Sequence, residues 1–373
     1  MALRVIEISE LSVFREHRGP WQTLWAHDRT ATIFQSFEWI EAYWKYFGEN
    51  EQLQVLLVYD GAELIGGVPC TIQRERRRVG ELRVLTFLND GWGSFYGPIG
   101  GSPQRSLEAA LEHGLRHSTQ WDLIDWRWIP DVPSSIAAVT QAFESLQMPF
   151  QRHFYSEVAL IDTRTPWDVY LSSRKRKFRE NLRRSERRLY EKGDVRFLRY
   201  RPAGAAEGEG DPRWDLFEEC VALAGRSWQG HSSNGTTLSH DAVFPFLREV
   251  HELAARCGML DVNLLYCDDE PIAFAYNYHR SGVVQGLRVG YAPEYRRYGA
   301  GNLMWYYSIR DSFERQDQLI DLGPEYLSVK EPWLTRVLRT YAFRHYRLAA
   351  RSQLLRLAHW LSHGHDGEPV MHH

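Results

Sequence analysis

The chain has 373 residues, of which 43% are hydrophobic and 25% are charged, and its formal net charge is −3. This composition is that of a globular protein long enough for two domains, and the near balance of charge gives no general attraction to nucleic acid. The four cysteines form no Cys-x-x-Cys pair and no histidine stands at metal-ligand spacing, so no structural zinc or other bound metal is expected.

No apolar stretch approaches the length needed to span a membrane, and the first residues carry acids rather than the apolar core of a signal peptide. Cysteines without a disulfide pattern are typical of a reducing compartment. The sequence therefore predicts a cytoplasmic protein without a membrane span, and it leaves the oligomeric state open.

In the first half of the chain, residues 37–47 and 106–117 have helical periodicity. Between them, residues 53–66 form two apolar runs around a turn at Asp60, the pattern of a β-hairpin. A strand is predicted at residues 121–129.

A loop at residues 89–96 of this first half is rich in glycine and aromatic side chains. Its Asp90, Trp92 and Tyr96 are candidates for holding a sugar or an amine. An ordinary turn with buried rings is the alternative.

The segment 174–188 carries nine arginines and lysines against two glutamates. On a helix these cations could bind polyphosphate or RNA. They could equally form a solvated face that pairs with acids such as Glu207 and Glu209.

In the second half, residues 260–273 can be laid over residues 53–66 without a gap. Helices are predicted at residues 215–227 and 243–257, so both halves have the same order of helix, hairpin, strand, helix and strand. This order predicts a duplicated α/β domain built on α+β mixed sheets. The coinciding pairs are Leu53/Leu260, Val55/Val262, Leu57/Leu264, Tyr59/Tyr266, Glu63/Glu270 and Ile65/Ile272.

Residues 291–302 lead from a β-rich run into a helix predicted at residues 302–313. A glycine turn before a helix brings several backbone N–H groups to one point, where the helix dipole also favours an anion such as pyrophosphate. A simple tight connection is the alternative, and a Rossmann loop would need glycine where Met304 stands. The residues expected at the anion are Arg296, Arg297, Gly299, Ala300, Gly301 and Asn302.

The stretch Arg296-x-x-Gly299-x-Gly301 resembles the acyl-CoA pyrophosphate loop of the GNAT acyltransferases. The duplication, together with Asp321-Leu-Gly and Lys330 nine residues on, is similar to the Fem-like tandem GNAT proteins, and within them to the acyltransferases named after CelD and BioF2. The resemblance implies a degenerate GNAT-like domain at residues 1–165, an acyltransferase domain at 166–345, and an amphipathic C-terminal helix and tail at 346–373.

The resemblance also implies roles for individual residues. The backbone around Leu287 and Val289 would polarise the thioester carbonyl, and Asp321 or, next in line, Glu325 would accept a proton. Tyr326 would protonate the leaving thiolate. The alternatives are a cap or turn role for Asp321 and a packed ring for Tyr326.

Two binding roles follow in the same way. Lys330 would bind a carboxylate or phosphate of the acceptor. The basic segment 174–188 gains a third interpretation, which is contact with the phosphoadenosine end of CoA or with a phosphorylated acceptor.

The function implied is a CoA-dependent N-acyltransferase that moves an acyl group, in the first instance acetyl, from acetyl-CoA to an amine of a small molecule or amino sugar used in envelope polysaccharide biosynthesis. A nucleic-acid partner is not expected. Two alternatives stay open: a Fem-like peptidyltransferase that uses aminoacyl-tRNA, and a non-catalytic glycan-binding subunit derived from the GNAT fold.

Overall fold

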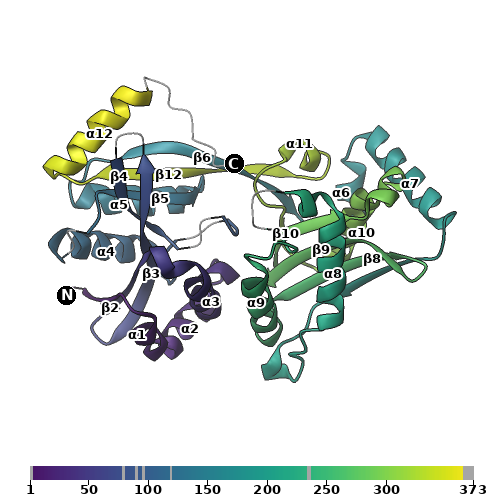
Figure 1. Ribbon diagram of the computed structural model, residues 1–373, viewed down its shortest axis with the longest axis horizontal. Coiled ribbons are helices and arrows are strands. Elements are labelled where there is room, and N and C mark those ends of the chain that lie inside the picture. The colour runs from purple at the N-terminus through teal and green to yellow at the C-terminus, as the bar shows by residue number, and fades with distance from the viewer. Residues whose placement is uncertain are drawn as a thin grey trace. The chain divides into compact units, whose positions relative to one another are not determined.

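The computed structural model describes residues 3–77, 80–88, 91–94, 97–117, 120–232 and 237–363 (Figure 1). The chain forms two compact units. Unit 1 comprises Met1–Asp90, Ser94–Glu157 and Leu338–His373, and unit 2 comprises Gly91–Gly93 and Val158–Val337. The domain boundaries at residues 165 and 345 stay a prediction from the sequence.

Unit 1 is a mixed sheet with strand order β1-β2-β3-β4-β5-β12, and its helices pack against that sheet. The helix predicted at residues 37–47 is confirmed as α3, which begins where the Ser36 hydroxyl accepts a hydrogen bond from the Trp39 N–H. The elements are β1 (Arg4–Ile8), α1 (Leu11–Glu16), α2 (Arg18–His27), η1 (Ile33–Gln35), α3 (Phe37–Phe47), η2 (Gly48–Asn50), β2 (Gln52–Asp60), β3 (Glu63–Arg77), β4 (Gly80–Phe87), α4 (Pro103–His117), β5 (Leu123–Pro130), α5 (Pro133–Ser145), the start of β6 (Gln151–Asp162), most of β12 (Arg336–Tyr346) and α12 (Ala350–His363).

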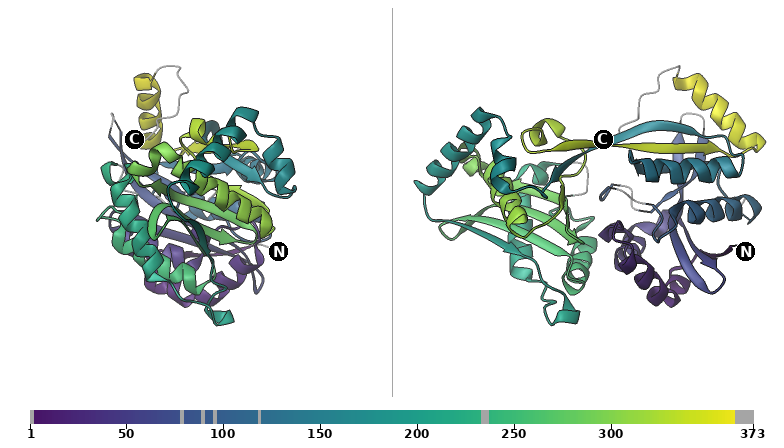
Figure 2. Two further views of the ribbon diagram at one scale, coloured as in Figure 1. Left: turned by 90° about the vertical axis from the view of Figure 1, so that its right-hand side faces the viewer. Right: turned by 180° about the vertical axis from the view of Figure 1, so that it is seen from behind.

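Unit 2 has the strand order β6-β11-β10-β9-β8-β7. Helices α8 and α9 lie on one face of this sheet and α10 lies on the other (Figures 1 and 2). The elements are the end of β6, α6 (Trp167–Ser172), α7 (Arg176–Tyr190), β7 (Val195–Tyr200), η3 (Ala205–Glu207), α8 (Trp214–Arg226), η4 (Trp228–His231), α9 (Phe244–Arg256), β8 (Leu260–Cys267), β9 (Glu270–Arg280), β10 (Val283–Tyr291), η5 (Pro293–Tyr298), α10 (Ala300–Glu314), β11 (Leu319–Asp321) and α11 (Leu327–Lys330).

The predicted repeat is confirmed by the register of the two hairpins. Strands β2 and β3 pair antiparallel with a register shift that leaves Ile65 as an extra residue. Strands β8 and β9 pair in the same way, and their shift leaves Ile272 as the extra residue. These isoleucines coincide in the sequence overlay, so both copies carry the same β-bulge at the same place.

The equivalence extends beyond the hairpins to the strands that follow. Val84 pairs with Leu123 in unit 1, and Val283 pairs with Leu319 in unit 2, both in parallel. Each second partner begins a Leu-Ile-Asp strand. Asp321 in unit 2 therefore has a structural counterpart in unit 1, Asp125.

A buried charge network holds α10 on the sheet of unit 2. The Arg199 guanidinium pairs with Asp261 at 2.6 Å and donates to the Ser308 carbonyl of α10 at 2.9 Å. Both Arg199 and Asp261 are almost wholly buried. Because a buried charge needs its partner, this network fixes the position of α10 and with it the start of that helix.

In the described part of the chain, no helix is both long enough and apolar enough to cross a membrane. The mixed α/β architecture predicted from the sequence is confirmed by the parallel and antiparallel strands of each unit and by the helices that pack against them.

Candidate functional site

The site begins where two parallel strands of unit 2 part. Strand β10 pairs with β11 over three residues and the last pair is Gln285 with Asp321, whereas β10 itself continues to Tyr291. On its other edge, the pairing of β10 with β9 shifts between Gly286 and Arg288, which makes Leu287 a β-bulge. The strands therefore open at Asp321, and the backbone of β10 beyond that point has no β11 partner.

Gly286 is required at this opening by a close approach. A Cβ atom at this position would lie 2.9 Å from the Asp321 carbonyl oxygen, which is closer than real Cβ atoms come. The glycine thus lets β10 pass the end of β11 with no side chain in the way.

Beyond the opening, β10 leads into η5 and then into α10. Gly299 is the N-cap of α10 with a φ of 73°, and no side chain caps this end of the helix. The first turn of α10 contains no acidic residue, and Arg296 and Arg297 are exposed just before it. The free N–H groups at this helix start, with Asn302 exposed in the first turn, fit an anion such as pyrophosphate.

The two glycines of this loop also have packing roles. A Cβ on Gly299 would lie 2.8 Å from the Ser185 hydroxyl of α7, and a Cβ on Gly301 would lie 2.8 Å from the Tyr291 ring. Ala300 between them is fully buried. The loop is thus held between α7 and the end of β10.

Asp321 lies at the point where the strands open and is 6% exposed. Its Oδ1 accepts a hydrogen bond from the Gly323 N–H at 2.6 Å. Burial raises the pKa of its carboxyl to about 6, against the opposing effects of the Gly323 N–H and the charge of Lys330. The carboxyl can therefore gain or lose a proton near neutral pH.

Lys330 ends α11 and is buried beside this carboxyl. Its ammonium donates to the carbonyls of Gly323 at 3.0 Å and Pro324 at 2.5 Å, so one of its three N–H groups remains for another partner. Burial lowers the pKa of Lys330 to about 8, although Asp321 opposes this shift.

Glu325 and Tyr326 form the turn that Lys330 holds. Their φ values are 62° and 46°, in the left-handed region that non-glycine residues rarely adopt. Both side chains are exposed, and Tyr326 is 65% exposed. Backbone strain of this kind is often found at functional sites.

Two further side chains, Trp228 and Gln229 of η4, were not found from the sequence. The Trp228 indole N–H and the Gln229 amide donate to the Val289 carbonyl of β10 at 3.3 and 3.2 Å. The Trp228 ring centroid lies 6.2 Å from that of Tyr326. No sequence signal marked these residues, because only the fold brings η4 to the edge of β10.

Of the predicted acceptor residues in the first half, Trp92 is buried and belongs to unit 2. Its ring lies 5.0 Å from Phe246, and the Arg288 guanidinium lies 5.7 Å from its centroid. The other two, Asp90 and Tyr96, lie outside the described residues.

The part of the chain that carries this site is similar to a known protein family. Residues 176–332 match the family described as acetyltransferase (GNAT) domain. This part of the chain is a GNAT domain. The match contains the parted strands, the loop before α10 and the Asp321–Lys330 pair.

Solved structures extend the likeness of fold to both units. The crystal structure of FemX aligns over 95% of this chain and 99% of its own, with a TM-score of 0.61 and 13% identity. The C-terminal domain of a putative lysylphosphatidylglycerol synthetase from Agrobacterium fabrum aligns over 95% and 99%, with a TM-score of 0.53 and 12% identity. The comparison with curated proteins found no match. The predicted tandem GNAT architecture is confirmed, and the narrower group of CelD and BioF2 stays a prediction.

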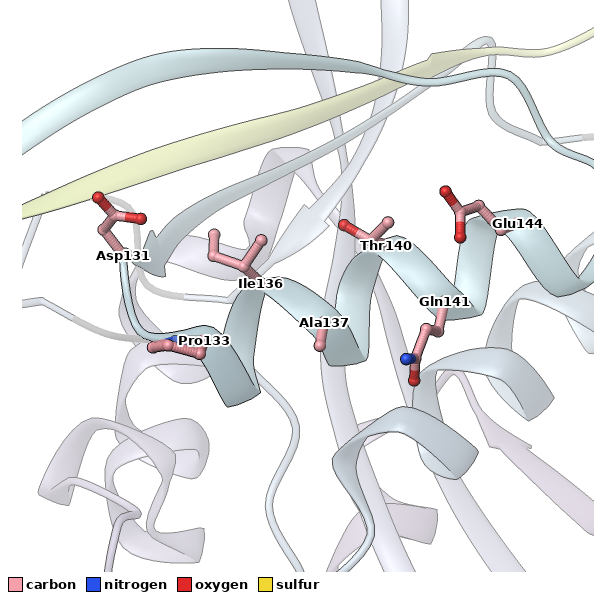
Figure 3. Close-up of a pocket in the computed structure, with 7 residues that line it drawn as sticks. All are labelled: Asp131, Pro133, Ile136, Ala137, Thr140, Gln141 and Glu144. Carbon is pink, nitrogen blue, oxygen red and sulfur yellow. The ribbon is translucent and has the colours of Figure 1, made fainter.

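The GNAT domain has no metal centre in the described residues, where no three His, Cys, Asp or Glu side chains gather in a way that could hold an ion. A surface hollow of unit 1 runs along α5 and is lined by Asp131, Pro133, Ile136, Ala137, Thr140, Gln141 and Glu144 (Figure 3). It belongs to the other unit and contains none of the residues predicted for catalysis.

Proposed function

We propose that the GNAT domain is a CoA-dependent N-acyltransferase that moves an acetyl group from acetyl-CoA to an amine of a small molecule or amino sugar. The observation that carries the proposal is the opening between β10 and β11, which has a buried carboxyl at its base and leads to an uncapped helix start. Donor binding, proton transfer and thiolate release each have a residue there.

The donor would bind along β10 and end at the loop before α10. The pyrophosphate would accept hydrogen bonds from the N–H groups of Ala300, Gly301 and Asn302, with Arg296 and Arg297 neutralising its charge. The thioester carbonyl would lie against the backbone of Leu287 in the bulge, where an N–H can stabilise the developing oxyanion.

Asp321 would serve as the base. In the reaction the amine nitrogen attacks the thioester carbon, the carbon–sulfur bond breaks, and the nitrogen loses a proton that Asp321 accepts directly or through one water. A carboxyl with a pKa of about 6 is mostly ionised at pH 7 and still basic enough to take that proton.

Tyr326 would return a proton to the departing thiolate. Its ring is exposed at the rim of the opening, and the turn that holds it is fixed by Lys330. Glu325, in the same turn, remains the second candidate for proton transfer. The remaining N–H of Lys330 would contact a polar group of the acceptor.

The chemistry of the site is compatible with many amines as the acceptor. We place the reaction in the cytoplasm, where acetyl-CoA is available, and its product in envelope polysaccharide synthesis. The aromatic rings of Trp228 and Tyr326 at the rim support an acceptor with a ring or sugar face.

Calorimetric titration with acetyl-CoA tests the donor. We expect micromolar binding by the wild type and a loss of at least about tenfold in Gly299→Ala, because its Cβ would meet Ser185 in a left-handed backbone. Gly208→Ala is the matched control, since its φ is 79° but nothing lies within 4 Å of its Cβ. Absence of binding in the wild type would overturn the proposal.

A second candidate is a peptidyltransferase that takes its donor from aminoacyl-tRNA. The exposed cations of α7 support it, because RNA binding depends on neutralising phosphates. Co-purification of RNA with the wild type, together with no affinity for acetyl-CoA, would favour this candidate over the first.

A further inference from the structure

Helix α7 separates its cations into two groups. Successive residues of a helix are turned by about 100°, so residues on opposite faces can be assigned from their numbers. On the face away from the loop, Arg176 pairs with Glu180 at 2.7 Å and Arg187 with Glu191 at 3.8 Å. These cations are already neutralised within the helix.

The flank beside the loop is different. Ser185 marks this flank, because its hydroxyl lies against Gly299. Arg188 and Arg184 lie about 60° and 100° from Ser185 around the helix axis, both on the same side of it. Among the described residues no carboxylate pairs with either guanidinium, and Arg184 bonds only the neutral Asn181 side chain at 2.7 Å.

The direction of this flank is set by contacts with α10. On the other side of Ser185, Glu186 accepts a hydrogen bond from the Tyr307 hydroxyl at 2.8 Å, two turns into α10. Going around α7 from Glu186 to Ser185, the contact with α10 therefore moves from Tyr307, in the body of that helix, to Gly299, its N-cap. The next side chains in that rotation, Arg188 and Arg184, extend beyond the start of α10.

We propose that Arg184 and Arg188 form a second phosphate subsite, beside the pyrophosphate loop, that binds the 3′-phosphate of CoA. This inference rests on the proposed function and adds to it the part of the donor that α7 recognises. A guanidinium is suited to the role because it presents several N–H donors to phosphate oxygens and stays charged at every working pH.

The geometry favours a single phosphate over a nucleic acid. RNA binding neutralises many phosphates along a strand and would need a continuous row of unpaired cations. Besides Arg184 and Arg188, this flank of α7 carries Lys177 about two turns nearer the helix start, whereas Arg179 and Arg183 point to other sides of the helix, so the flank offers three cations and not a longer row.

The test compares CoA with 3′-dephospho-CoA by calorimetry at one fixed salt concentration. We expect the wild type to bind CoA roughly tenfold more tightly than dephospho-CoA. The double variant Arg184→Gln/Arg188→Gln should lose this preference by weakening CoA alone. Arg187→Gln, which removes a cation from the paired face, should leave both affinities unchanged.

Each other outcome is decisive. Equal affinity of the wild type for the two ligands would overturn the subsite and leave the proposed function standing. Equal weakening of both ligands in the double variant would also overturn it, since the change would then be one of general charge. Binding of neither ligand would overturn the proposed function and the subsite with it. If the wild type and Arg187→Gln bind tRNA, the double variant does not, and the affinity for CoA is the same in all three, then the flank binds RNA and the CoA subsite is overturned.

Discussion

The two units carry the same Leu-Ile-Asp strand in the same register, yet the pKa values of their aspartates are shifted in opposite directions. Asp125 in unit 1 is wholly buried and pairs with Arg127 at 3.0 Å and Arg344 at 3.1 Å. Burial alone would raise the pKa of Asp125, but the two guanidinium groups outweigh it and the pKa is lowered. Among the described residues no arginine pairs with Asp321 in unit 2, and burial raises its pKa to about 6 against the opposing charge of Lys330.

Two positions account for the difference. Across the sheet, Asp125 faces Arg344, whereas Asp321 faces Leu160. Two residues further along the chain, Arg127 in unit 1 corresponds to Gly323 in unit 2. In unit 1 the cation at each position stabilises the carboxylate and lowers its pKa. In unit 2 the leucine and the glycine supply no charge, so burial raises the pKa.

The space beside the aspartate also differs. Phe87 in unit 1 occupies the position of Gly286 in unit 2, and its ring stacks on Trp126 at 5.4 Å. The strands part in both units, since β4 and β5 pair only at Val84 with Leu123 and at Leu85 with Ile124. In unit 1, however, aromatic rings and ion pairs fill the region beside the aspartate, whereas in unit 2 Gly286 places no side chain there.

The largest expected effect is on activity. Asp321→Asn should lower kcat/KM for acetyl transfer to the best acceptor in a panel of amines and amino sugars by about 10²- to 10⁴-fold, because the base is lost. In the wild type, kcat/KM should rise with pH through about 6 as Asp321 ionises, and the variant should lack this limb. A variant that keeps both rate and limb would show that another group takes the proton.

Asp125→Asn should act on stability instead. Removing the carboxylate leaves Arg127 and Arg344 without their buried partner, and we expect a loss of about 3 to 5 kcal/mol in the free energy of unfolding, measured in urea at pH 7. Asp60→Asn, which breaks an exposed ion pair with Arg105, is the control and should cost less than about 1 kcal/mol. A loss at Asp125 no larger than in the control would show that the pairs contribute little.

Asp321→Asn should change stability with the opposite sign. The pKa of Asp321 is raised on folding, so its contribution to stability is fully present below about pH 4 and is lost as the pH rises through about 6. The variant should therefore be more stable than the wild type by about 2 to 3 kcal/mol at pH 8 and about equal to it at pH 4. Urea unfolding at the two pH values measures this, and equal effects at both would contradict the raised pKa.

The smallest expected effect concerns the strained turn. Glu325→Gly should raise the free energy of unfolding by about 0.5 to 1 kcal/mol, because glycine adopts a φ of 62° without strain. Gln147→Gly in unit 1, at a φ of 53°, should give a similar gain. Only the first should also lower the acetyl transfer rate, by several-fold, and an unchanged rate would show that the turn need not be rigid.

Much of the fold could be predicted from the sequence because its signals are local. The alternation of residues 53–66 and 260–273 fixes both hairpins, and helical periodicity fixes α3 and α8 to within a residue or two. The loop before α10 was found in the same way, since a glycine N-cap and a following helix are neighbours in the chain.

The rest of the site depends on contacts between distant segments. Leu160 lies across from Asp321 although the two are far apart in sequence, and this leucine helps to decide the pKa of the carboxyl. Trp228 reaches the Val289 carbonyl, and Ser185 reaches Gly299, only through the packing of η4 and α7.

The sequence by itself determined the repeat, the order of elements and the anion loop, because propensity and periodicity act between residues close in the chain. The tertiary structure, together with the residue two positions further along the chain (Arg127 or Gly323), decided which of two Leu-Ile-Asp strands carries a carboxyl able to exchange a proton near neutral pH. That property depends on the cross-strand neighbour and on burial, Arg344 beside Asp125 and Leu160 beside Asp321, and neither is encoded within the three residues that the strands share.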